Sequence, residues 1–155
     1  MRVPYFKQET GYTCGAASMR MALATFGIRK SEKQIARLMR TNRKHGTCSA
    51  SFPRLAEKYR ASFVVKRNGT IDDLKKYLKE GYVVVVSFFF FEYFVGKKLV
   101  YHFAVLKGIS KGNIFLLDPE LGPDHKLPIH LFVRCWKSNP VSEKGDRHWF
   151  FAIKK

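Results

Sequence analysis

The chain has 155 residues, of which 46% are hydrophobic; this is enough for one self-sufficient core and too little for two, so we expect a single domain over residues 1–155. Lys and Arg number 29 against 12 Asp and Glu, and the net charge of +17 favours acidic partners without naming one. No apolar run is long enough to cross a bilayer, and residues 1–8 lack the apolar stretch of a secretory signal, so we expect a cytosolic protein.

The first predicted element is a largely buried helix over residues 14–26, with Gly27 as a left-handed cap. Cys14 stands at its start, directly after a turn that contains Gly11. Helix N-termini present unpaired backbone N–H groups and a partial positive charge, and both favour the nucleophilic thiolate over the thiol. Taken alone, Cys14 also fits a small buried core cysteine.

Further helices follow before the first strand and again after it. Ser31 opens the second helix with Gln34 three residues later, which is the spacing of a capping box. After a basic loop at residues 41–47, apolar residues at helical spacing predict a third helix over residues 51–60. A strand is predicted at residues 61–65, and Thr70 caps a fourth helix that continues through Lys79.

The second half of the chain is rich in β-branched and aromatic residues. These predict strands at residues 82–91, 99–109, 113–117 and 148–153, with a short helix at residues 129–136. Several of the connections are too short to hold a crossover helix, so neighbouring strands should run antiparallel. The predicted fold class is therefore α+β, with N-terminal helices packed on a mostly antiparallel sheet.

The hairpin that joins the second and third of these strands decides where His102 and Asp118 lie. If residues 108–112 form a five-residue loop, Lys107 pairs with Asn113 and His102 lies directly opposite Asp118, with Cβ atoms about 5 Å apart. A slip of one residue would send the two side chains to opposite faces. Pro119 ends the strand immediately after Asp118, so the carboxylate should sit at a strand end.

Cys14, His102 and Asp118 form the set that nucleophilic thiol chemistry requires: a sulfur, a base to take its proton and a group to hold the base. Singly, His102 also fits a hydrogen-bonded core histidine, and Asp118 fits a turn former before a proline. The case for a site depends on the three residues acting together.

Neither a metal nor a disulfide is indicated. The three cysteines, Cys14, Cys48 and Cys135, are widely spaced and contain no C-x-x-C pair. The five histidines lack the H-E-x-x-H spacing that would place two of them on one helical face. We therefore expect free thiols and no cofactor.

Four sequence elements resemble a known family. They are Gln8 followed after five residues by Cys14-Gly15-Ala16-Ala17, Gly46-Thr47 before the third helix, His102-Phe103-Ala104-Val105-Leu106, and Asp118-Pro119 with Gly122 beyond. On these residues the chain resembles the bacteriocin-processing, double-glycine leader peptidases. That family consists of cysteine peptidases of papain-like fold, often found at the N-terminus of peptide-exporting transporters.

The resemblance implies a role for each matching residue. Cys14 is the nucleophile, His102 the general base and later acid, Asp118 the residue that orients His102, and the Gln8 side chain an oxyanion donor beside the Cys14 backbone N–H. It also implies a peptide substrate with a small-residue cleavage site and a separate membrane transporter as partner, at the cytoplasmic face of a membrane. The basic surface adds a preference for an acidic peptide. Cys48 departs from the Gly-Thr-Ser pattern of the family, and its role stays open between regulatory thiol, rival nucleophile and buried residue.

The leading interpretation is a thiol peptidase that forms an acyl-enzyme at Cys14. Acyl or amide transfer by the same residues remains open, because an amine can resolve a thioester as water does. A non-catalytic peptide-binding module is the alternative from another class, although all four chemical residues are present. A basic nucleic-acid-binding protein is the least favoured, since no nucleic-acid motif accompanies the charge.

Overall fold

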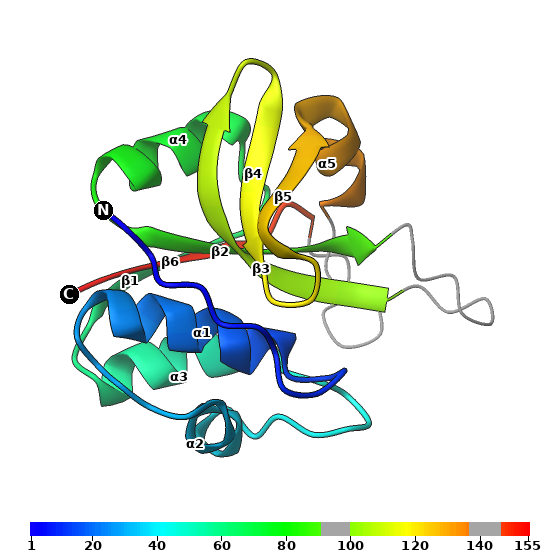
Figure 1. The fold of residues 1–155 in the computed structure, drawn as a ribbon. Helices are drawn as coiled ribbons and strands as arrows, with labels where there is room; N and C mark the ends of the chain where they lie inside the picture. Colours follow the sequence, from blue (N-terminus) through cyan, green and yellow to red (C-terminus); the bar gives the residue numbers. More distant parts are fainter. Residues whose placement is uncertain (91–99, 137–146) are drawn as a thin grey trace.

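The computed structural model describes residues 1–90, 100–136 and 147–155 (Figure 1). Most of the helices lie in the first half of the chain and most of the strands in the second half. In order they are α1 (Cys14–Thr25), α2 (Glu32–Leu38), α3 (Ser51–Lys58), β1 (Ser62–Lys66), α4 (Ile71–Lys79), β2 (Val83–Phe90), β3 (Val100–Ser110), β4 (Asn113–Asp118), β5 (Gly122–Pro128), α5 (Ile129–Cys135) and β6 (Phe150–Lys154).

The strands form one sheet in the order β1-β6-β2-β3-β4-β5, and every neighbouring pair is antiparallel. Helices α1 to α3 pack on one face of the sheet, while α4 and α5 lie on the other (Figure 1). Residues that alternate along β2 divide between two hydrophobic clusters: Val83 and Val85 face α1, whereas Val84 and Val86 face the α4 and α5 side. The predicted α+β fold is confirmed.

The helix boundaries follow the predicted capping signals. The Ser31 hydroxyl accepts a hydrogen bond from the Gln34 backbone N–H at 3.1 Å, and the Gln34 side-chain oxygen accepts one from the Ser31 N–H at 2.9 Å. Thr70 caps α4 through the Asp73 N–H at 3.1 Å. Gly27 follows α1 with φ of 79°, as the left-handed cap predicted. Among the described residues, no helix combines the length and apolar character needed to span a bilayer.

The predicted β3–β4 register is wrong. Lys111 and Gly112 have φ of 49° and 76° and form a two-residue turn, so that Ser110 pairs with Asn113. Positive φ at both central residues is the mark of a tight type I′ hairpin, whose twist matches that of the flanking strands, and this turn replaces the predicted five-residue loop.

A β-bulge between Leu106 and Gly108 then shifts the ladder once more, and Val105 pairs with Leu117. Continuing that register sets Asp118 against Ala104, so His102 is its diagonal neighbour rather than the residue directly opposite. The bulge shifts the pairing by one residue, and this shift places His102 and Asp118 on the same face of the sheet.

Strand β5 was missed from the sequence. It contains Gly122, Pro123 and Pro128, which are typical of turns rather than strands, and it lies at the edge of the sheet, where proline is tolerated because one side of the backbone needs no ladder partner. Residues 91 and 99, at the ends of two predicted strands, lie outside the described part of the chain.

Candidate active site

Cys14 is the first residue of α1, as the sequence predicts, and its side chain is half-buried. The preceding Thr13 is buried and holds the turn together, because its hydroxyl accepts a hydrogen bond from the Thr10 N–H at 3.2 Å and lies 2.8 Å from the Thr10 hydroxyl. The side chain of Thr13 does not cap the helix. The backbone N–H groups of the first turn of α1 therefore receive no side-chain acceptor from Thr13.

The start of α1 is pressed against the loop that precedes α3. A Cβ atom placed on Gly15 would lie 2.7 Å from both Cβ and Oγ1 of Thr47, closer than side chains pack. Thr47 is itself buried, and its hydroxyl lies 2.7 Å from that of Thr41. The predicted Cys-Gly and Gly-Thr elements thus meet, and only glycine at position 15 allows the approach.

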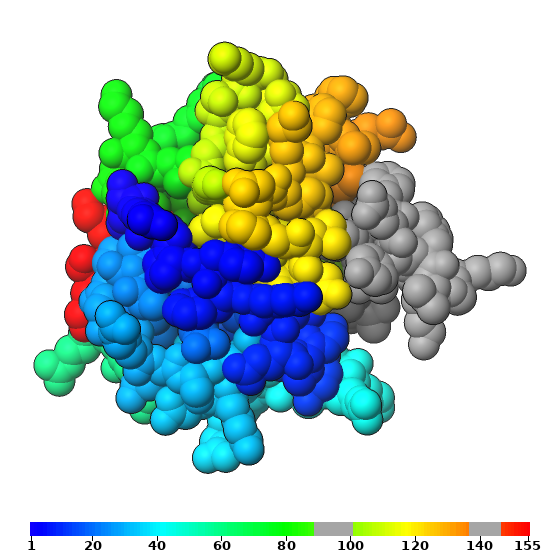
Figure 2. Space-filling view, in the orientation of Figure 1, coloured from blue at the N-terminus to red at the C-terminus, as the bar shows by residue number. Residues whose placement is uncertain are grey.

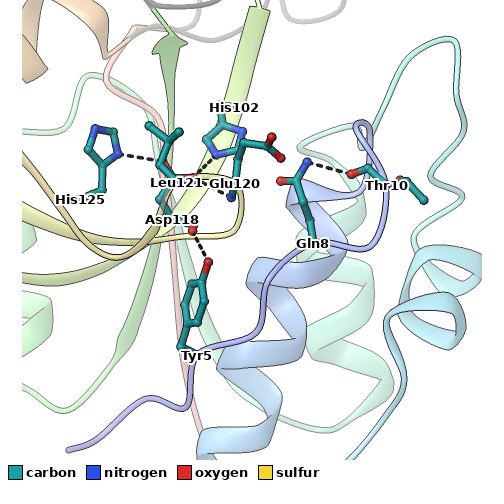
Figure 3. Close-up of polar contacts among 8 residues, drawn as sticks. All are labelled: Tyr5, Gln8, Thr10, His102, Asp118, Glu120, Leu121 and His125. Atoms are coloured by element: carbon teal, nitrogen blue, oxygen red, sulfur yellow. Dashed lines mark hydrogen bonds and ion pairs between the residues drawn. The ribbon is translucent and has the colours of Figure 1, made fainter.

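His102 comes from β3 and Asp118 from the last position of β4, and both are buried, with side chains 6% and 0% exposed. The Nε2 atom of His102 lies 2.7 Å from Oδ1 of Asp118. The same oxygen accepts hydrogen bonds from the backbone N–H groups of Glu120 at 2.9 Å and Leu121 at 3.0 Å (Figure 3). The turn after Pro119 therefore wraps around the carboxylate and directs it at His102.

The electrostatics connect Cys14 to this pair. Burial disfavours the charged imidazolium, but the negative charge of Cys14 and hydrogen bonds with Asp118 and Cys14 outweigh it and raise the pKa of His102 to about 10. Burial likewise opposes ionisation of Asp118, yet hydrogen bonds with His102 and His125 hold the pKa of its carboxyl well below the ordinary value. The arrangement favours a charged imidazolium at His102 that the Asp118 carboxylate stabilises.

The N-terminal segment crosses the surface between the helical part and β3 to β5 (Figure 2). Two of its residues bind the end of β4: the Tyr5 hydroxyl donates to the Asp118 carbonyl at 2.9 Å, and the Gln8 backbone N–H donates to the Pro119 carbonyl at 2.9 Å. Gln8 is thereby held beside Asp118, and its side chain extends towards the strand that carries His102 (Figure 3).

The side-chain amide of Gln8 already makes one hydrogen bond. Its Nε2 atom donates to the Thr10 carbonyl at 2.8 Å, while Oε1 is buried and has no hydrogen-bond partner among the described residues. The structure therefore brings the four predicted residues Gln8, Cys14, His102 and Asp118 into one region, although the bond to Thr10 occupies one of the two N–H groups of the amide.

His125 is the member of this region that sequence reasoning missed. It lies in β5 with its side chain 16% exposed, and its Nδ1 atom is 2.8 Å from Oδ2 of Asp118. No spacing rule connects it to Cys14 or His102, and β5 itself carries no strand signal. The only sequence clue was a histidine seven residues after Asp118.

The remaining thiols differ from Cys14 in exposure. Cys48 is exposed, which excludes the interpretation of a buried residue, and Cys135 is buried in α5. Within residues 1–90, 100–136 and 147–155, no group of three or more His, Cys, Asp or Glu side chains is arranged to hold a metal ion.

Comparison with solved structures places the chain in the papain-like peptidase fold. A C39-like peptidase from Bacillus anthracis has 18% identity and a TM-score of 0.70, with 99% of this chain and 95% of that chain covered. A double glycine motif protease from the AMS/PCAT transporter, solved in complex with the leader peptide, has 24% identity and a TM-score of 0.71 over 99% and 91% of the two chains. The peptidase domain of Streptococcus ComA, a bi-functional ABC transporter involved in quorum sensing, has 19% identity and a TM-score of 0.70 over 99% and 97%.

The family is shown by sequence. The model of the Peptidase_C39 like family matches residues 1–139, so the chain belongs to that family and is a cysteine peptidase. The search of curated proteins found no match. The predicted resemblance to the double-glycine leader peptidases is confirmed at the level of family and fold.

Proposed function

We propose that residues 1–155 form one catalytic domain that hydrolyses a peptide bond through a Cys14–His102–Asp118 triad and an acyl-enzyme. The observation that carries the proposal is the position of His102, whose Nε2 atom lies 2.7 Å from Asp118 Oδ1 and whose pKa is raised by Cys14 and Asp118 together. Because Nε2 faces Asp118, Nδ1 is the nitrogen that serves the sulfur. A base held in this way can take and return one proton without turning its ring.

The reaction then proceeds in two halves. The Cys14 thiolate attacks the carbonyl carbon of the scissile bond, and the electron pair of the C=O bond moves onto oxygen. When the oxyanion collapses, the C–N bond breaks and the His102 imidazolium gives its proton to the leaving amine. Water next attacks the thioester while His102 takes one proton from it. The second collapse breaks the C–S bond and releases a carboxylic acid, which gives its own proton to solvent, while the proton taken from water stays on His102 beside the regenerated thiolate.

Gln8 is the proposed oxyanion donor, together with the Cys14 backbone N–H. A neutral amide can stabilise the developing charge without neutralising the thiolate, and one N–H of its amide remains in addition to the one that binds Thr10. The backbone bond from Gln8 to Pro119 keeps this donor on the same scaffold as Asp118.

The proposed substrate is a peptide with a small-residue, double-glycine-like cleavage site. The family and two solved relatives support this choice: one relative is a double glycine motif protease in complex with the leader peptide, and the other is the peptidase domain of a transporter. The net charge of +17 favours an acidic peptide. A separate membrane transporter is the proposed partner, and the cytoplasmic side of a membrane the proposed location.

The test is a digestion of a peptide library that includes double-glycine leaders, with products identified by mass spectrometry. The parent protein should cleave after small residues, and Cys14→Ala and His102→Ala should not. Cys48→Ala serves as the matched control for loss of a thiol, because Cys48 is exposed and lies outside the proposed triad. Equal cleavage by the parent and Cys14→Ala would rule out the mechanism.

The same variants separate hydrolysis from the alternatives. Added hydroxylamine traps an acyl-enzyme as a hydroxamate. A transferase would transfer the acyl group to added amines and release correspondingly less of the acid product. A binding module would bind the leader peptide without forming either product.

A further inference from the structure

The Asp118 carboxylate is held on both of its oxygens. Oδ1 faces His102 Nε2 and the two backbone N–H groups of the following turn, whereas Oδ2 faces His125 Nδ1 at 2.8 Å. The Asp118 side chain is 0% exposed. The partner of Oδ2 therefore comes from another strand and not from the turn that serves Oδ1.

The direction of the bond at Oδ2 follows from the charge of Asp118. An ionised carboxylate only accepts hydrogen bonds, so Nδ1 of His125 must carry the hydrogen. It carries that hydrogen in this tautomer of the neutral ring and in the charged ring alike. Other ionisable groups near this part of β5 are His102 on β3, Glu120 in the turn, and the Lys107–Asp124 ion pair across β3 and β5.

His125 and His102 also share a packing neighbour, the Phe88 ring. The Phe88 ring of β2 lies 6.4 Å from the His125 ring and 5.7 Å from the His102 ring, between centroids. Phe88 is 1% exposed and packs on Phe132 of α5. The two imidazoles thus share one aromatic neighbour and one carboxylate.

We propose that His125 is a positioning residue for the peptidase reaction, which holds the Asp118 carboxylate in the rotation that aims Oδ1 at His102. Without a donor at Oδ2, the carboxylate can turn about its Cβ–Cγ bond, and the hydrogen bond to His102 Nε2 loses its fixed direction. This inference rests on the proposed triad. It assigns to β5 a part in the reaction in addition to its part in the sheet.

The test compares three substitutions at position 125 in the full chain. His125→Leu removes the donor and keeps an apolar side chain beside Phe88. His125→Asn restores a donor, because the Asn amide nitrogen is as many bonds from Cα as Nδ1. His125→Gln places its amide nitrogen one bond further out. Lys126→Leu is the matched control, since Lys126 is the next residue of β5 and is exposed.

The expected result is a loss of kcat with KM unchanged. Hydrogen bonds to charged groups contribute about 1.5–3 kcal/mol, so His125→Leu should lower kcat on a cleaved library peptide about 10- to 100-fold. His125→Asn should recover most of that loss, and His125→Gln should not. Should His125→Leu fail to fold by circular dichroism, the Asn and Gln pair decides, because the two differ chiefly in where the donor sits.

A second readout is the rate at which iodoacetamide alkylates Cys14, measured against pH for each variant. We expect the profile of His125→Leu to differ from that of the parent and the profile of His125→Asn to match it. The inference is overturned if Leu and Gln match the parent in both kcat and alkylation, or if Asn is no better than Gln. Failure of the proposed function would give a different result: the parent would cleave no peptide, or Cys14→Ala would cleave as well as the parent. In either case the alkylation profiles would still decide the role of His125.

Discussion

Gly15→Ala tests how Cys14, the proposed nucleophile, is positioned. In the interior of a helix, alanine is favoured over glycine by about 1 kcal/mol, so propensity alone predicts a more stable protein. The added Cβ, however, would lie 2.7 Å from Cβ and Oγ1 of Thr47, and neither atom is the free end of a flexible side chain. Overpacking destabilises by about 1–3 kcal/mol, and an approach of 2.7 Å belongs to the upper half of that range, about 2–3 kcal/mol, so the steric term exceeds the gain in propensity.

The expected net loss of roughly 1–2 kcal/mol corresponds to a fall in Tm of roughly 2–8 °C for a chain of this size. The start of α1 must move away from the loop, and a displacement near 1 Å at Cys14 lowers the rate about 100-fold.

Differential scanning calorimetry and the alkylation rate of Cys14 measure the two effects. Gly11→Ala is the control, because it lies in the preceding turn and an added Cβ there meets no atom within 4 Å. If Gly15→Ala is as stable as the parent and Cys14 reacts at the same rate, the close approach does not fix the nucleophile.

Three further outcomes are expected. Because the pKa of His102 is raised to about 10, its imidazolium persists at neutral pH. The stabilisation that this charge provides is complete below about pH 6.5 and is lost as the pH rises through 10. The alkaline limb of kcat/KM should therefore lie well above pH 6.5, and a limb near pH 6.5 would contradict the ion pair. Gln8→Ala should lower kcat about 100- to 1000-fold with little change in Tm, since its backbone bond to Pro119 is kept; wild-type kcat would remove Gln8 from the oxyanion site. Thr70→Ala should reduce the free energy of unfolding by about 1 kcal/mol in urea titrations and leave kcat unchanged, and a loss of kcat would show that α4 influences the site.

Local signals predicted the helices well because their causes lie within a few residues. The predicted capping box at Ser31, the cap at Thr70 and the glycine after α1 mark boundaries that the structure reproduces. The strands β2, β3, β4 and β6 were also found, since runs of β-branched and aromatic residues carry their own signal. Fold class and the position of Cys14 at a helix start followed from these elements.

The register could not be predicted, because it depends on backbone twist more than on residue type. Lys111 carries a long side chain that gives no sign of positive φ, so the two-residue turn was not recognised. The β-bulge in β3, which places His102 and Asp118 on the same face of the sheet, is a tertiary feature. His102 and Asp118 still meet, by a different pairing from the one predicted.

Strand β5 and His125 were missed for a related reason. An edge strand can contain proline and glycine because its partner supplies the ladder, so composition misleads there. The contact between His125 and Asp118 requires β4 and β5 to pair, and β5 carries no strand signal of its own.

The bond from the Tyr5 hydroxyl to the Asp118 carbonyl joins residues 113 positions apart. During synthesis, the sulfur of α1 therefore leaves the ribosome long before the strands that would activate it, and a nascent chain carries an unassisted thiol. Contacts between such distant residues form late, because the loop they close is long. Peptidase activity is therefore a property of the fully folded molecule. The time at which activity appears during folding would show when the last strands have formed.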